Sequence, residues 1–180
     1  MLTFIIIISS LLWIASFAAL FRKILLAPAL SYLALLTLSF ASSDGYPLIP
    51  VNATILWGWL AMTIVVMVAT ILQSDAINRS SRGIPYMFVG GIAGMSVGLL
   101  GYTVTFDISL LYGIMIACTV AGILLGFLLY TNTPDGRNLR PGSGMFVKYL
   151  SAKGFTVAIS IMQLGVALVI TLAMHNIGSL

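Results

Sequence analysis

The chain has 180 residues, of which 61% are hydrophobic and only 7% are charged, and it contains no Glu. A soluble domain needs roughly a quarter of its residues charged, so this composition excludes an ordinary water-soluble fold. The net charge of +4 does not indicate nucleic-acid binding, because the basic residues stand in separate short segments and form no continuous stripe. We therefore expect a single all-α integral membrane domain covering residues 1–180, with no nucleic-acid partner.

Six apolar segments approach or exceed the length of about 20 residues that a helix needs to cross the hydrocarbon core of a bilayer. We predict a bundle of six transmembrane helices at residues 2–21, 24–41, 53–72, 84–105, 108–130 and 154–174. The first segment differs from a cleavable signal peptide, because its apolar stretch is too long and its positive charges follow that stretch. We expect it to be a retained span.

All Lys and Arg residues fall in the first, third and fifth connections between these spans. Short basic loops stay in the cytoplasm, so we predict these three connections inside and both termini outside, in a bacterial inner membrane. The predicted interfacial cations are Arg22, Lys23, Arg79, Arg82, Arg137, Arg140, Lys148 and Lys153. Trp57 and Trp59 mark the outer end of the third span, where aromatic side chains favour the membrane interface.

Two connections carry structural signals of their own. Residues 42–52 are expected to form an outer loop, with a turn signal at Asp44 and Gly45. The longest connection begins with residues 131–144, which are rich in turn-forming residues and are predicted to be irregular. Residues 145–152 then predict a short helix, which either lies at the cytoplasmic interface or extends the sixth span by two turns.

The order of long and short connections suggests an internal symmetry. Each half of the chain contains a tight hairpin, a longer loop and a third helix, and the odd number of spans would insert the second half upside down. Such 3+3 inverted repeats are common in transporters, whose substrate sites lie between the repeats. The halves show no residue-by-residue similarity, so this hypothesis rests on loop lengths alone.

Glycines recur at intervals of four in two neighbouring spans, at Gly90, Gly94 and Gly98 in the fourth and at Gly122 and Gly126 in the fifth. This spacing leaves a smooth helix face that lets another backbone approach closely. We predict a close hairpin between these two spans. The alternative is a functional face that serves as a hinge, lines a pore or docks another subunit.

The residues that most enzymes need are missing. His175 is the sole histidine and Cys118 the sole cysteine, which leaves no metal-ligand cluster, no intrachain disulfide and no pair of haem ligands. The spans contain essentially no ionisable side chain, and this argues against a self-sufficient proton pump. We expect no catalytic residue, no metal, no cofactor and no enzymatic activity.

Gln163, in the middle of the sixth span, is the polar side chain that is most costly to place in a membrane. A buried amide needs a hydrogen-bonding partner or water. One interpretation is a hydrogen bond to a neighbouring helix. The other is a polar pathway that runs between the two halves, past Gln163 and the Ser96 face of the fourth span.

Two functions are consistent with these features. The first is a permease-like protein that binds or moves a small neutral or apolar solute. The second is a non-catalytic structural subunit of a larger membrane complex. The expected partners are the lipid bilayer together with further copies of this chain or other membrane subunits.

Overall fold

A computed structural model describes residues 2–40, 42–43, 46–47, 53–72, 82–101 and 108–177. The described residues are helical apart from connecting turns and two very short strands, β1 (Ser42–Ser43) and β2 (Tyr46–Pro47), which pair antiparallel. These strands flank the turn predicted at residues 44–45, which itself lies outside the described residues.

The long helices are α1 (Leu2–Arg22), α2 (Ala27–Ser39), α3 (Ala53–Ile71), α5 (Ile84–Leu100), α6 (Ile108–Thr131) and α8 (Phe155–Ile177). In the described part of the chain, four helices are long and apolar enough to cross a membrane: α1, α3, α6 and the continuous helix that contains α8. Helix α5, and α2 together with the 3-10 turn η1 (Ile24–Leu26) that precedes it, are apolar but shorter.

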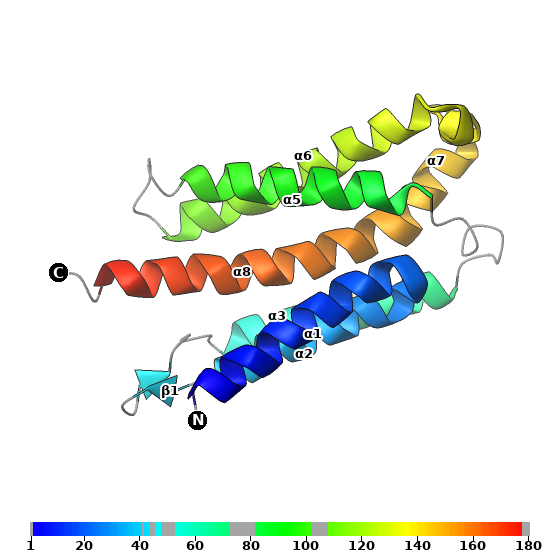
Figure 1. Ribbon diagram of the computed structural model, residues 1–180. Helices are drawn as coiled ribbons and strands as arrows, with labels where there is room; N and C mark the ends of the chain where they lie inside the picture. The colour runs from blue at the N-terminus through cyan, green and yellow to red at the C-terminus, as the bar shows by residue number, and fades with distance from the viewer. Residues whose placement is uncertain are drawn as a thin grey trace.

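Helix α8 occupies the centre of the molecule. Figure 1 shows it running between α1, α2 and α3 on one side and α5 and α6 on the other, and it contacts helices of both groups. In the most apolar 18-residue stretch of its helix, 78% of the residues are buried, compared with 17% in α3. The two helices that an inverted repeat would pair, α3 and α8, therefore have unlike surroundings.

The short helix predicted before the last span extends that span. Helix α7 (Gly144–Tyr149) continues through the π-helical turn η4 (Leu150–Gly154) into α8. Tyr149 fixes this extension against the bundle, because its hydroxyl accepts the Gly83 amide at 3.2 Å and its ring stacks on Phe127 with centroids 5.4 Å apart. At its other end α8 continues to Ile177, three residues beyond the predicted end of the span.

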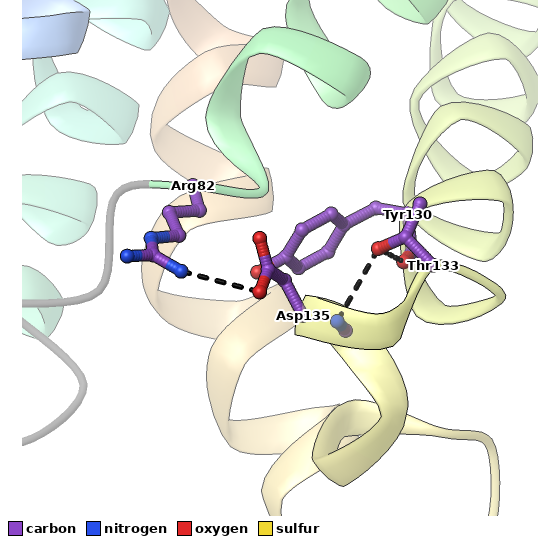
Figure 2. A network of polar contacts seen from close by, with 5 residues as sticks. Arg82, Tyr130, Thr133 and Asp135 are labelled. Atoms are coloured by element: carbon purple, nitrogen blue, oxygen red, sulfur yellow. Dashed lines mark hydrogen bonds and ion pairs between the residues drawn. The ribbon is translucent and has the colours of Figure 1, made fainter.

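The longest connection is more regular than its composition predicts. Pro134–Leu139 form the 3-10 helix η3, so the prediction of an irregular segment is wrong there. The Thr133 hydroxyl donates to the Tyr130 carbonyl at 2.6 Å and accepts the Gly136 amide at 3.3 Å (Figure 2). A Cβ at Gly136 would collide with that same carbonyl oxygen, so this tight turn requires glycine. Local capping therefore orders a segment that is rich in turn-forming residues.

The described cations lie at one end of the bundle. Helix α1 begins and α8 ends on the same side, and α7 lies at the opposite end (Figure 1). At the α7 end are the end of α1, the start of α5 and the connection from α6 to α8, which together carry Arg22, Lys23, Arg82, Arg137, Arg140, Lys148 and Lys153. Arg79 lies outside the described residues.

Helices α5 and α6 approach each other through their glycines. A Cβ at Gly90 would collide with the Gly122 carbonyl oxygen, and a Cβ at Gly122 would collide with the Gly90 carbonyl oxygen. At Gly94 and Gly126 a Cβ would likewise strike a carbonyl oxygen of the opposite helix, and at Gly98 it would strike the α6 backbone. This geometry directs α-hydrogens of glycine at carbonyl oxygens across the contact, as in weak Cα–H···O bonds.

Candidate functional site

Gln163 lies where three helices meet, and its side chain is fully buried. Its Nε2 donates to the Thr63 hydroxyl on α3 at 2.9 Å, and its Oε1 accepts the Ser31 hydroxyl on α2 in a short hydrogen bond. A single amide therefore joins α2, α3 and α8. Because a buried amide is costly without partners, these bonds account for Gln163 by the first of its two interpretations.

Gln163 forms one end of a polar stripe along the central helix. Thr156 and Ser160 precede it on the same helix and are also fully buried. The Thr156 and Thr70 hydroxyls lie 3.2 Å apart across the contact between α8 and α3, and Ser160 donates to the Thr156 carbonyl at 2.9 Å. Lys153 precedes this stripe within η4. Spacings of three and four residues place such side chains on one face of a helix, here toward α2 and α3.

Lys153 differs from the other predicted interfacial cations. The other described Lys and Arg residues are exposed, whereas Lys153 is only 1% exposed. The π-helical turn η4 contacts α3, α5 and α6, and this position places the lysine inside the α7 end of the bundle. π-helical turns are frequent at functional sites, and an ammonium group is rarely buried without a role or a partner.

Two further hydroxyl groups join the first two helices. Ser9 donates to the Ala34 carbonyl at 2.9 Å and Ser16 donates to the Ala27 carbonyl at 2.7 Å, and both serines are buried. Hydrogen bonds of this kind hold transmembrane helices together because lipid offers the hydroxyl group no competing partner. The group of α1, α2 and α3 and its contact with α8 therefore depend on polar side chains.

An apolar groove of about 500 Å³ lies between α3 and α6, with α8 contributing to its wall. Its lining includes Gly58, Met62, Ile116, Phe155 and Met162, and none of the described residues that line it is charged. The groove thus lies between α3, on one side of the central helix, and α6, on the other side, and α8 forms part of its wall.

Trp59 and Tyr112 bridge this groove. The Trp59 indole Nε1 donates to the Tyr112 hydroxyl at 3.1 Å, which links α3 directly to α6. Among the described residues, the phenol hydrogen of Tyr112 has no acceptor. The two tryptophans that were predicted to be interfacial therefore differ. The Trp57 side chain is 69% exposed, whereas Trp59 is half-buried and lines the groove.

The structure does not bring Ser96 to Gln163. Ser96 is exposed on α5, and its hydroxyl donates to the Ile92 carbonyl of its own helix at 2.9 Å. The buried face of α5 is formed instead by residues such as Met87 and Met95. Of the two residues that the predicted polar pathway joins, Ser96 is therefore exposed on α5, and Gln163 is buried between α2, α3 and α8.

At the α7 end of the bundle, one exposed ion pair connects two segments that are distant in the sequence. Arg82 Nη1 lies 3.2 Å from Asp135 Oδ1, with side chains 74% and 62% exposed. Figure 2 shows the two side chains pointing toward one another beside the Tyr130 ring. Exposed pairs of this kind contribute little to stability, so this pair adds little to the contact between the start of α5 and η3.

Sequence reasoning missed two features of the site. The stripe could have been recognised, because Thr156, Ser160 and Gln163 follow helical spacing in the sequence. Tyr112 could not, because its partner Trp59 is 53 residues away along the chain.

Among the described residues, no group of three or more His, Cys, Asp or Glu side chains could hold a metal ion. Comparisons with known proteins find no matching family model, no matching curated protein and no matching solved structure. Function is therefore inferred from the geometry.

Proposed function

We propose that this chain is a permease-like integral membrane protein that binds or moves a small neutral or apolar solute. The groove between α3 and α6 is the observation that carries this proposal. Ligand sites are usually apolar, with a few polar groups that orient the ligand. Here the apolar lining suits an uncharged solute, and the Tyr112 hydroxyl supplies a donor at the bridge.

The proposal includes six spans. Helix α5 and the segment Ile24–Ser39 have 17 and 16 residues, which correspond to about 26 and 24 Å of helix. A bilayer core is about 30 Å thick and can thin locally around a short span. Both segments lie alongside the longer helices (Figure 1). The 3+3 inverted repeat stays a prediction, and nothing in the proposal depends on it.

The proposal also includes an orientation, with both termini outside a bacterial inner membrane. Its support is the position of the described cations at the α7 end of the bundle, which the positive-inside rule assigns to the cytoplasm. In a Cys118→Ser background, we expect a membrane-impermeant thiol reagent applied to intact cells to label Phe40→Cys and to spare Asn138→Cys. Both positions are exposed, so the opposite labelling pattern would reverse the orientation.

Transport can be tested with the full chain in lipid vesicles. We expect the chain to accelerate vesicle swelling in glycerol or urea relative to protein-free vesicles. For apolar solutes, we expect indole to raise the unfolding temperature of the protein in detergent. Ile116→Trp should abolish both effects because it fills the groove, whereas Val68→Trp, on an exposed position of α3 outside the groove, should not. Wild-type protein without either effect would contradict the proposal.

The second candidate function is a non-catalytic subunit of a membrane complex. It is favoured by the large apolar side chains that α3 exposes, which include Trp57, Val65 and Ile71. Lipid or a partner helix could cover this face. A stable hetero-complex in native mass measurements after gentle extraction would favour this function, and a monomer or homo-oligomer with solute-dependent stabilisation would favour the permease.

A further inference from the structure

The face of the α5–α6 pair that points away from α8 carries a second apolar groove, which is larger than the groove between α3 and α6. Its volume is about 730 Å³. Gly90, Gly94, Gly122 and Gly126 are part of its lining, and apolar side chains such as Val97 and Leu125 line it as well. It faces away from α8, because the α5 residues that contact the centre of the fold, Met87 and Met95 among them, do not line it.

The length of this groove matches one leaflet of a bilayer. Its lining runs from Pro85 to Val97 on α5 and from Leu129 back to Cys118 on α6. At 1.5 Å per residue these stretches measure about 18 and 16 Å. Half of the hydrocarbon core of a bilayer is about 15 Å. Both stretches are shorter than the full core of about 30 Å, so the length of the groove fits a single lipid chain.

The groove begins beside a basic residue. Arg82 lies three residues before Pro85, and its guanidinium points at Asp135, whose carboxylate lies beside the Tyr130 ring (Figure 2). The Tyr130 ring in turn packs on Tyr86 of the groove, with centroids 5.4 Å apart. The pair of Arg82 with Asp135 is exposed to solvent and weak. Arg137 and Arg140 lie in the same connection as Asp135 and leave this end of the bundle positive. Such clusters attract anionic headgroups.

We propose that this groove binds one acyl chain of an anionic phospholipid, with the phosphate of the lipid at Arg82. The assignment to the inner leaflet rests on the proposed orientation. The groove and its charge do not depend on that orientation, and the proposal is independent of any solute between α3 and α6. The lipid would cover the surface over the α5–α6 glycines, where the two backbones contact each other.

The test uses the purified full chain in a neutral detergent. Dioleoyl phosphatidylglycerol should raise the unfolding temperature by several degrees, dioleoyl phosphatidylcholine should raise it less, and glycerol 3-phosphate, which has no acyl chain, should not raise it. Ala93→Phe fills the groove from an exposed lining position and should abolish the effect of both lipids. Arg82→Gln should remove only the preference for phosphatidylglycerol.

A matched control is Ala18→Phe, which adds the same ring at an exposed position of α1 and should keep the full lipid effect. The proposal is overturned if both lipids stabilise the wild type equally or if Ala93→Phe keeps the lipid effect. It is also overturned if Ala93→Phe changes only the oligomeric mass, since the groove would then be a contact between copies. If glycerol 3-phosphate alone stabilises the wild type, the site recognises free phosphate and not a lipid.

Discussion

The α5–α6 contact and the contact of α8 with α2 and α3 join helices in opposite ways. Between α5 and α6, glycines bring the two backbones together, and backbone atoms of the other helix face Gly90, Gly94, Gly98, Gly122 and Gly126. Between α8 and its neighbours, side chains meet and hydrogen-bond through Gln163, Ser31 and Thr63. The first contact depends on the absence of side chains, and the second depends on their chemistry.

This difference predicts how each contact tolerates substitution. A backbone contact cannot accommodate an added side chain without separating the helices, because carbonyl groups have no alternative rotamer. A side-chain hydrogen bond between transmembrane helices contributes only about 0.6 kcal/mol on average, and its partners can often bond elsewhere. We therefore expect the apolar contact to be the less tolerant of the two.

The largest effect should come from Gly94→Leu. A Cβ there would collide with the Cys118 carbonyl oxygen, so we expect the α5–α6 hairpin to open and monodisperse protein to be lost in size-exclusion chromatography. The matched control is Gly113→Leu on α6, where a Cβ would have no neighbour within 4 Å. Equal behaviour of the two variants would show that the glycine contact does not limit the fold.

Gln163→Leu should have a moderate effect, with a loss of about 1 kcal/mol in the free energy of unfolding, because it removes two interhelical hydrogen bonds. No donor is orphaned, since Ser31 can still donate to the Pro28 carbonyl and Thr63 to the Trp59 carbonyl. The measurement is a titration with a denaturing detergent.

Gln163→Ala tests the role of shape at the same position. It should cost about 2 kcal/mol or more, because it adds a cavity to the loss of the two bonds. If Gln163→Leu is as disruptive as Gly94→Leu, the comparison between the two contacts fails.

A smaller effect is expected where α3 and α8 meet nearer the α7 end of the bundle. The Thr70 and Thr156 hydroxyls are 3.2 Å apart, yet each also donates to a carbonyl of its own helix, at Val66 and Ala152. A double-mutant cycle with Thr70→Val and Thr156→Val should therefore give a coupling of at most about 0.6 kcal/mol. A coupling well above that value would show that the polar stripe acts as a network.

The smallest effect should come from Ser96→Ala. The hydroxyl is exposed and bonds only within α5, so stability in the denaturant titration and solute uptake in vesicles should both stay unchanged. Lost uptake with intact stability would restore the predicted pathway past the Ser96 face.

These contrasts show which parts of the fold can be read from the sequence. The α5–α6 hairpin could be predicted, because glycine spacing within each helix specifies the contact. The need for partners at Gln163 could also be predicted, because an isolated amide in a membrane is costly. The identity of those partners could not, since Ser31 is 132 residues away and Thr63 is 100 residues away.

The central position of α8 was likewise beyond sequence reasoning. Its composition resembles that of other spans, and only tertiary packing shows that it is buried where α3 is exposed. The burial of Lys153 could not be predicted from the sequence for a related reason. A lysine at the end of an apolar segment is usually interfacial, and the π-helical turn that places this one inside the bundle leaves no clear pattern in the sequence.

The burial of α8 also has a consequence for the order in which the protein can assemble. Because α8 follows the other helices along the chain, α2 and α3 would enter the membrane before their shared partner Gln163 has been synthesised. During that interval the two hydroxyl groups that Gln163 later binds can bond only within their own helices. Until α8 is made, the hydrogen bonds of Ser9 and Ser16 join α1 to α2, whereas α3 lacks the side-chain hydrogen bonds that later hold it to α8.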